Sequence, residues 1–352
     1  SYGCIFKPHI NCRTNKTNKT NKKRKHKNKT KKISKIIINK DDKYFDHEYT
    51  INQLISTISN HKIWTVLWDE KCLPPYYSEI KNNTGIKECL TKSKKTITEY
   101  NEYAKMLLGD YGGVPFFHDY CQKIIKKSTF TSFKKFENMF LKLFKLLNNL
   151  FIGLIELQKI KIVHQDLASH NILIKNNQLY IIDYGLSCKF NDIQFIYERS
   201  KKQIVGNRIY DPYPYEYVFM YANIQQKKKE INRIKNKNYR NNHLEYLIIH
   251  KSIFNRNNIH KVIINNLKTN LTDKTNIIQK LDTYSLGILI INILCQMSFK
   301  YNIPRKQLLK CFRISGIQNH MALLKDMTEY HSNNRIDIFT AYERYKSLLK
   351  LY

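Results

Sequence analysis

Closely spaced cysteine pairs are missing from this sequence. Its eight cysteines stand at positions 4, 12, 72, 89, 121, 188, 295 and 311. None of them forms the C-x-x-C spacing that is typical of zinc sites and dithiol redox motifs. We therefore expect no zinc site, and reduced thiols in an intracellular compartment.

A hydrophobic run long enough to cross a bilayer is also missing. The longest apolar stretch, Leu286 to Cys295, is interrupted by Asn292 and falls short of the roughly 20 residues that a spanning helix needs. We predict a buried helix there and no membrane segment. No secretory signal is visible, and because the chain opens on Ser1 rather than Met we expect its natural start to be truncated.

Acidic residues are scarce. Against 61 lysines and arginines there are 28 aspartates and glutamates, which gives a formal net charge of +33. Such a charge attracts any polyanion, so a nucleic-acid partner is one interpretation. The lysines are not interleaved with aromatic residues as a single-strand binding groove requires, so we favour a compositional bias toward Lys and Asn.

The chain does have the length and apolar content of a two-lobed enzyme. Its 352 residues are 42% hydrophobic, enough to bury a sizeable core. One stretch, Ile162 to Gly185, holds the most informative pattern. Asp166 stands two residues after His164, Asn171 follows five residues later, and Asp183 comes directly after an apolar run.

The spacing within this stretch predicts a β-hairpin. Two apolar strands, 171–174 and 179–182, flank a turn at 176–177, and such a hairpin brings its outer ends to one edge. Carboxylate and amide oxygens gathered there suit magnesium and a phosphate, with Asp166 as the proton acceptor and Asn171 and Asp183 as metal ligands. The alternative is a solvated hairpin with acidic ends.

These residues resemble the motifs of the protein kinase superfamily. HQDLASHN resembles the catalytic loop H-x-D-L-x-x-x-N, and DYG resembles the metal-binding D-F-G. The Lys/Asn bias, with YGCIFKP and DYGLSC, is similar to serine/threonine kinases of giant DNA viruses. The resemblance implies an α+β, bilobal fold in which a small β-rich lobe with one main helix precedes a larger, mostly helical lobe.

The resemblance also implies a division of the chain. We expect the small lobe over 1–110 and the large lobe over 111–352, with the hinge near Gly112 and Gly113. A Lys/Thr/Asn tract, 13–32, has almost no apolar residue and is predicted to be a disordered insert. A second insertion is expected at 217–281, with a polar tract and a possible helix over 243–254.

Several residues of the first 110 are assigned to nucleotide binding by the resemblance. Gly3 and Ile5 stand where a glycine-rich loop would end, although its first two glycines are absent. Lys35, on a predicted strand over 33–38, corresponds to the strand lysine, with Lys32 and Lys40 as alternatives. Glu48, on a helix predicted from Asp41 or Asp42 to about Asn60, would pair with that lysine.

The periodicity of that helix independently places Glu48 on an apolar face, where an unpaired carboxylate is costly. The predicted stripe is Tyr44, Glu48, Ile51, Ile55 and Ile58. Further along, strands are expected at 64–68 and 104–108, separated by a Lys-rich loop over 82–95. A long amphipathic helix is expected over 136–159.

Structural roles complete the assignment. Besides His164 in the catalytic loop, Glu216 stands in the position of the A-P-E glutamate, and Arg335 would be its buried partner. Asp282, in DTYSLG, would bind backbone N–H groups of the catalytic loop, although it could equally be a helix cap.

Two departures bear on activity. Ala168 replaces the lysine of serine/threonine kinases, and His170 or another lysine would have to substitute. Gln165 replaces the arginine of H-R-D, which predicts activity independent of activation-segment phosphorylation.

We therefore expect an ATP- and Mg²⁺-dependent (or Mn²⁺-dependent) kinase acting on serine or threonine of proteins, located in the host cytoplasm or in the virion. The alternatives are a nucleotide-binding pseudokinase scaffold and a small-molecule kinase. Magnesium-dependent ATP binding is the test for the protein kinase and the pseudokinase, and acceptor screening is the test for the small-molecule kinase.

Overall fold

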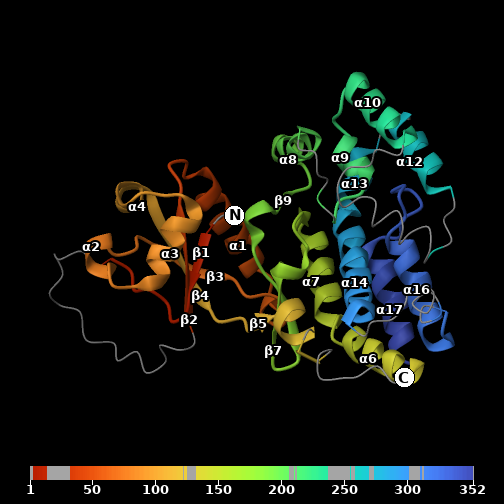
Figure 1. The fold of residues 1–352 in the computed structure, drawn as a ribbon, viewed down its shortest axis with the longest axis horizontal. Helices are drawn as coiled ribbons and strands as arrows, with labels where there is room; N and C mark the ends of the chain where they lie inside the picture. Colours follow the sequence, from red (N-terminus) through yellow and green to blue (C-terminus); the bar gives the residue numbers. More distant parts are fainter. Residues whose placement is uncertain are drawn as a thin grey trace. The chain divides into compact units, whose positions relative to one another are not determined.

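The computed structural model divides the chain into two compact units (Figure 1). One consists of Ser1–Gly113 with Ile182–Leu186, and the other of Val114–Ile181 with Ser187–Tyr352. The structure describes residues 3–13, 32–121, 123–124, 132–205, 210, 212–236, 254, 258–268, 273–300, 310 and 313–351.

A four-stranded antiparallel sheet forms the frame of the first unit, in the order β1-β2-β4-β3. The strands are β1 (Gly3–Phe6), β2 (Lys32–Ile38), β3 (Trp68–Cys72) and β4 (Ala104–Asp110). Ile36, Met106 and Leu107 are buried, as β-branched and apolar residues on central strands should be. The strands predicted at 33–38 and 104–108 are confirmed. The one expected at 64–68 begins only at Trp68.

Helices occupy more of this unit than the sequence suggested. They are α1 (Lys43–Ser56), η1 (His61–Ile63), α2 (Tyr77–Ile80), α3 (Thr84–Ser93), α4 (Ile97–Tyr103) and η4 (Tyr184–Leu186). The prediction of a Lys-rich loop over 82–95 is wrong. The Asn83 side chain caps the N-terminus of α3 by accepting from the Ile86 N–H, and the helix then buries Ile86, Cys89 and Leu90. The prediction of one main helix in this unit is therefore wrong.

The predicted face of α1 needs a one-residue correction. Phe45, rather than Tyr44, joins Glu48, Ile51 and Ile55 in the core. Tyr44 is exposed because a helix begun at Lys43 turns its first aromatic position toward solvent. The helix also stops at Ser56 rather than at about Asn60. Asp42 stands at the N-cap, but its side chain makes no capping hydrogen bond and pairs with Lys105 instead.

Two disulfides cross the first unit. Cys4 is bonded to Cys89, and Cys12 to Cys72. The expectation of reduced thiols throughout is therefore wrong for these four residues. The paired cysteines are 85 and 60 residues apart in the sequence, so their spacing did not indicate that they lie close together. They meet because β1 and the segment after it lie against α3 and β3. Cys121 and Cys188 are free thiols.

The disordered insert predicted over 13–32 lies mostly outside the described residues. Its two end residues contradict the prediction, because both have defined partners. The Arg13 guanidinium lies 3.7 Å from the centre of the Tyr76 ring. Lys32 begins β2 and its Nζ lies 3.0 Å from Asp69.

The hairpin of the second unit forms where it was predicted. β7 (Ile172–Lys175) and β8 (Gln178–Ile181) pair with Lys175 opposite Gln178. Asn176 and Asn177 have φ values of 52° and 58°. Positive φ at both central residues is the geometry of a type I′ turn, which Asn tolerates. β5 (Val114–Pro115) adds to β7, and β6 (Ile162–Val163) pairs with β9 (Cys188–Lys189).

Most of the rest of the second unit is helical. The helices of at least eight residues are α6 (Phe133–Lys145), α7 (Asn148–Lys159), α8 (Ile193–Val205), α10 (Ile224–Lys235), α12 (Ile259–Lys268), α14 (Leu281–Lys300), α16 (Ser315–Met327) and α17 (Ile338–Leu349). The shorter ones are η2 (Phe116–Cys121), η3 (Ser169–Asn171), α9 (Tyr215–Phe219) and α13 (Lys274–Gln279).

The long helix predicted over 136–159 is divided into α6 and α7 by a turn at Leu146 and Leu147. Both residues keep helical dihedrals, so the apolar stripe continues unbroken through the turn. Within the predicted 217–281 insertion, the polar tract begins as α10, and the possible helix over 243–254 lies outside the described residues, apart from Phe254.

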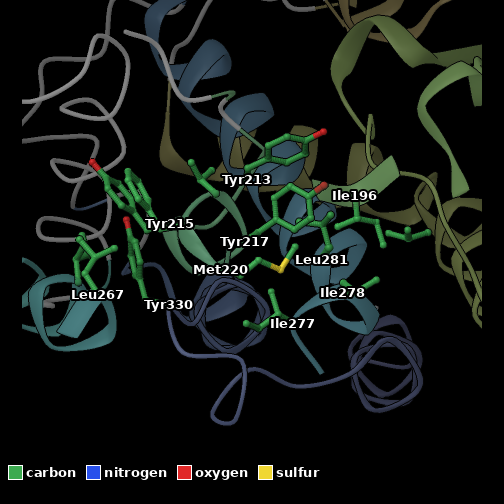
Figure 2. Close-up of a cluster of buried hydrophobic side chains, with 14 of the residues drawn as sticks. Ile196, Tyr213, Tyr215, Tyr217, Met220, Leu267, Ile277, Ile278, Leu281 and Tyr330 are labelled. Carbon is green, nitrogen blue, oxygen red and sulfur yellow. The ribbon is translucent and has the colours of Figure 1, made fainter. Parts of the chain in front are cut away.

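A buried cluster joins α9 to the helices around it (Figure 2). Every residue of α9 is buried, and Tyr213, Tyr215 and Tyr217 lie among aliphatic side chains of α12 and α13. Within the part of the chain that is described, one segment, Lys274–Cys295, is long and apolar enough to cross a membrane. Because 83% of it is buried inside the protein, it is core, as predicted for Leu286 to Cys295.

Candidate active site

Lys35 and Glu48 form a buried ion pair in the first unit. Lys35 Nζ lies 2.7 Å and 3.0 Å from the two carboxylate oxygens of Glu48, and both side chains are almost fully buried. The Trp68 indole N–H donates to the same carboxylate at 3.1 Å. The Asn52 side chain accepts from the Trp68 backbone N–H and donates to the Glu48 carbonyl, which fixes β3 against α1.

Asp183 shares this lysine. Its Oδ1 lies 3.1 Å from Lys35 Nζ, and it belongs to the same unit through the segment Ile182–Leu186. Burial acts to lower the pKa of Lys35, but the Glu48 and Asp183 carboxylates outweigh it and raise the pKa above its usual value. Lys35 is therefore a fixed cation held between two acids.

The backbone around Asp183 is held in a strained conformation. Its φ of 65° lies in the left-handed region, which non-glycine residues seldom occupy. The next residue, Tyr184, is buried and its hydroxyl donates to Thr65 Oγ1 at 2.7 Å. Tyrosine in the place of phenylalanine in DYG is thus anchored by a polar contact, which holds Asp183 toward Lys35.

The two alternative lysines, Lys32 and Lys40, have different surroundings. Lys32 makes its contacts with Asp69 and Asp110 at the surface, and Lys40 is exposed. Lys35 is the one buried against Glu48. Gly3 lies directly over it, since a Cβ at Gly3 would come 2.9 Å from Lys35 Cγ and force it to move. Ile5 is opposite Lys35 in the sheet register and is largely exposed.

In the second unit, Asp166 and Asn171 are joined directly. The Asn171 side-chain amide donates to Asp166 Oδ2 at 2.9 Å and to the Asp166 carbonyl at 2.8 Å. Both residues are buried, with Asp166 8% exposed. The η3 turn closes this loop, because the Asn171 N–H bonds the Ala168 carbonyl at 2.9 Å. The amide nitrogen is fully used, which leaves the Asn171 Oδ1 as the atom able to bind a cation.

Asp282 fixes the backbone of this loop. Its carboxylate accepts from the His164 N–H at 2.6 Å and from the Gln165 N–H at 3.1 Å. Asp282 lies inside the first turn of α14, one residue after its start, so the alternative of an N-cap does not describe it. His164 is fully buried and its Nδ1 accepts from the Asp166 N–H at 3.1 Å. The imidazole therefore braces the aspartate that follows it.

Gln165 is enclosed by neutral partners. Its backbone carbonyl accepts from the Tyr213 hydroxyl at 2.6 Å, and its side-chain oxygen accepts from the Tyr217 hydroxyl. Its amide nitrogen lies 2.8 Å from Cys188 Sγ. The side chain is completely buried and its φ is 63°, so this network holds a strained residue in place.

Arg199 of α8 extends this network toward Asp166. Its Nε donates to the Tyr213 hydroxyl at 2.8 Å. Burial acts to lower the pKa of Arg199, but Tyr213 and then Asp166 outweigh it and raise the pKa. His170 Nε2 is 4.0 Å from Asp166 Oδ2 and its side chain is mostly exposed. Two cationic or potentially cationic side chains thus lie near a loop that has Ala168 in place of lysine.

Glu216 and Arg335 form the second buried ion pair. Arg335 Nη2 lies 2.6 Å from Glu216 Oε1, and neither side chain has any exposed area. The other oxygen of Glu216 accepts from the Ser332 N–H at 2.9 Å, and Arg335 Nε donates to the Glu329 carbonyl at 2.8 Å. The pair ties α9 to the loop before α17.

The predicted metal ligands fit magnesium by their chemistry. An amide oxygen on Asn171 and a carboxylate on Asp183 are the hard oxygen donors that Mg²⁺ prefers. Across the described residues, no group of three or more His, Cys, Asp and Glu side chains is arranged to hold a metal ion.

A family model described as "Protein tyrosine and serine/threonine kinase" matches residues 87–207. The matched segment runs from α3 through the hairpin and Asp183 to the end of α8. No curated protein matches the chain. The match supports the protein kinase superfamily, and the mixed helix and strand structure is compatible with the predicted α+β class.

Sequence reasoning missed the polar partners that hold the site residues. Trp68, Asn52, Thr65, Tyr213, Tyr217 and Arg199 are not marked by any motif. The dense run of tyrosines from 210 to 221 was the one available signal, because buried tyrosine hydroxyls need partners.

Proposed function

We propose that the protein is an ATP-dependent protein kinase that transfers the γ-phosphate to serine or threonine hydroxyls of protein substrates. The observation that carries the proposal is the buried Lys35 held by Glu48 and Asp183. A structural role alone does not account for it, because a fully buried cation between two carboxylates is costly to assemble. This arrangement suits a lysine that binds the phosphate oxygens of a nucleotide.

In this proposal the catalytic loop handles the proton. Asp166 accepts the proton of the attacking hydroxyl, and Asn171 orients the Asp166 carboxylate through its amide. The resemblance makes Asn171 and Asp183 each a candidate ligand of magnesium, an ion that would neutralise charge on the phosphates. Phosphoryl transfer depends mainly on such positioning, so the rigid loop fixed by Asp282 serves it directly.

Because position 168 is alanine and not lysine, another side chain must stabilise the transferring phosphate in this proposal. Arg199 and His170 both bring positive charge, or the capacity for it, close to Asp166, and either would stabilise the transferring group. We expect Arg199→Gln to lower turnover more than His170→Ala, since Arg199 is held by Tyr213 whereas His170 is mostly exposed.

The test is transfer of labelled phosphate from ATP, with Mg²⁺ or Mn²⁺, to the protein itself and to generic protein acceptors. Asp166→Asn and Asp183→Asn should each abolish transfer, while Asp46→Asn, an exposed carboxylate on α1, should leave it unchanged. Phosphoamino-acid analysis then distinguishes serine and threonine from tyrosine as the acceptor. Phosphotyrosine alone would overturn the proposed acceptor but not the proposed chemistry.

A nucleotide-binding scaffold without transfer is the second candidate, and Ala168 favours it. It predicts that the wild-type chain binds ATP with magnesium yet transfers no phosphate to any acceptor. Transfer to a small molecule but to no protein would instead indicate a small-molecule kinase. Magnesium-dependent ATP binding, measured on wild type and on Lys35→Met, therefore accompanies the transfer assay.

A further inference from the structure

A pocket of about 330 Å³ opens beside α8 in the second unit. Four of its lining residues, Tyr197, Ser200, Lys201 and Ile204, come from α8. The others, Tyr221, Asn223 and Gln226, come from the start of α10 and the turn before it. The rings of Tyr197 and Tyr221 meet edge to face, with their centres 5.6 Å apart, and make an aromatic wall.

Ser200 is the feature of this pocket that a purely structural role does not explain. Its side chain is fully buried, and its hydroxyl has no hydrogen-bond partner in the described part of the chain. A buried hydroxyl left unpaired costs about 1 to 3 kcal/mol. Because Ser200 lines the pocket, a ligand there would supply the missing partner.

Positive charge gathers around the same pocket. Lys201 lines it, and Lys274 Nζ lies 4.3 Å from the centre of the Tyr221 ring. Lys227 follows Gln226 on α10, and burial together with the charge of Lys274 lowers the pKa of Lys227. None of these three lysines forms an ion pair with a described residue. Lys227 and Lys274 therefore repel each other, and a bound anion would reduce this repulsion.

The start of α10 adds a further attraction for an anion. This twelve-residue helix begins at Ile224, and its N-cap residue Asn223 and its third residue Gln226 line the pocket. These two residues cap each other: the Asn223 side chain accepts from the Gln226 N–H at 2.8 Å, and the Gln226 side chain accepts from the Asn223 N–H at 2.9 Å. The positive end of the helix dipole remains at the pocket beside the lysines. No acidic residue lines the pocket.

We propose that this pocket binds a phosphorylated side chain of a polypeptide. A phosphate monoester carries close to two negative charges and three acceptor oxygens, which matches lysines at 201, 227 and 274 and the Ser200 hydroxyl. A carboxylate would engage fewer of these donors. The aromatic wall of Tyr197 and Tyr221 suits the carbon atoms of the residue that carries the phosphate.

This site goes beyond the proposed phosphoryl transfer, because it requires neither ATP nor Asp166. It would let the protein hold a partner that has already been phosphorylated. Binding is therefore measured on the full chain without nucleotide, so that failure of the kinase proposal and failure of this one give separate results.

The probe is a short alanine peptide with phosphoserine at its centre, compared with the same peptide bearing serine or glutamate. Binding is followed by calorimetry at 150 mM salt, which limits nonspecific attraction to the +33 chain. We expect the phosphoserine peptide to bind at least tenfold more tightly than either control. Lys201→Gln and Lys274→Gln should each weaken it by about tenfold.

Lys229→Gln is the matched control, because it removes the same charge from an exposed position on α10. It should change the affinity less than twofold. Equal losses in the pocket variants and in Lys229→Gln would mean nonspecific attraction and would overturn the proposal. So would equal affinity for the phosphoserine and serine peptides. Inorganic phosphate binding as tightly as the phosphopeptide would assign the site to a free anion instead of a polypeptide.

Discussion

The carboxylate of Asp282 accepts a 2.6 Å hydrogen bond from the backbone N–H of His164, a residue 118 positions earlier in the chain. It accepts a second from Gln165. Two buried N–H groups of the loop that carries Asp166 therefore depend on one side chain of α14. The loop conformation that presents Asp166 follows from this contact.

Replacing Asp282 should therefore harm both stability and activity. Asp282→Ala leaves two buried N–H groups unpaired, at about 1 to 3 kcal/mol each, and should lower the free energy of unfolding by about 2 to 6 kcal/mol. Urea denaturation measures this loss. Asp273→Ala, an exposed cap of α13, is the control and should cost only about 1 kcal/mol. Equal losses in the two variants would contradict the prediction.

Removal of one partner from the Glu216 and Arg335 ion pair should strongly destabilise the folded protein. Arg335→Met leaves the Glu216 carboxylate buried without its cation, which costs about 3 to 5 kcal/mol. The double variant Glu216→Gln with Arg335→Met should recover part of this loss, because no charge is then buried alone. Lys346→Met, which breaks an exposed pair with Glu343, serves as the control and should change stability by less than about 1 kcal/mol.

Activity should not depend on phosphorylation of the segment between Asp183 and Glu216. Gln165 is neutral, and its side chain is already bonded to Tyr217 and Cys188, so it offers no cation to a phosphate. Phosphatase treatment should leave transfer within about twofold of the untreated protein. A loss of tenfold or more after treatment would show that another residue fulfils the role of the arginine.

His320 should make the protein less stable in acid. Its ring packs at its edges against Phe140 and Phe144, and burial lowers its pKa to about 4. The unfolded chain, with a histidine pKa near 6.5, binds the proton more readily, so stability falls as pH drops from about 6.5 toward 4. The loss over this range is about 3 kcal/mol.

Thermal unfolding across this pH range checks the prediction. His320→Phe removes the titrating group and should flatten the acid side of the stability curve. His118→Gln, at an exposed histidine, should keep the curve of the wild type. A variant at His320 that retains the wild-type acid dependence would exclude this residue as its source.

Reduction should destabilise the first unit. The disulfides close loops of 85 and 60 residues. A crosslink of this span lowers the entropy of the unfolded chain and so stabilises the folded state by about 4 kcal/mol. The second disulfide adds less, because its loop overlaps the first. Dithiothreitol should therefore lower the unfolding midpoint of the wild type. Cys4→Ala with Cys89→Ala should show a smaller response, and Cys121→Ala, at a free thiol, should respond like the wild type.

The residues that the sequence predicted best are those that a short motif brings together. The hairpin from Ile172 to Ile181 needs only local turn chemistry, so it could be predicted from two asparagines between two short apolar runs. The periodicity of α1 placed Glu48 on an apolar face, where a carboxylate needs a cation, and the resemblance to kinases supplied Lys35 as that cation.

The features that escaped prediction depend on tertiary structure. Capping by Asn83 and burial of Cys89 turned a Lys-rich stretch into α3, since lysines at the exposed positions of a helix conceal its apolar face. The contact of Tyr217 with Gln165 spans 52 residues and no local pattern encodes it. The disulfides likewise join cysteines whose spacing is uninformative.

The two disulfides also determine how the chain comes apart when it is cut. The crosslink from Cys12 to Cys72 lies inside the one from Cys4 to Cys89, so a break at any peptide bond between Cys12 and Cys72 leaves the two fragments joined twice. Trypsin acting among the lysines of 13–32 would therefore release no amino-terminal peptide until a reductant is added. The strand that covers Lys35 would stay attached to a nicked protein.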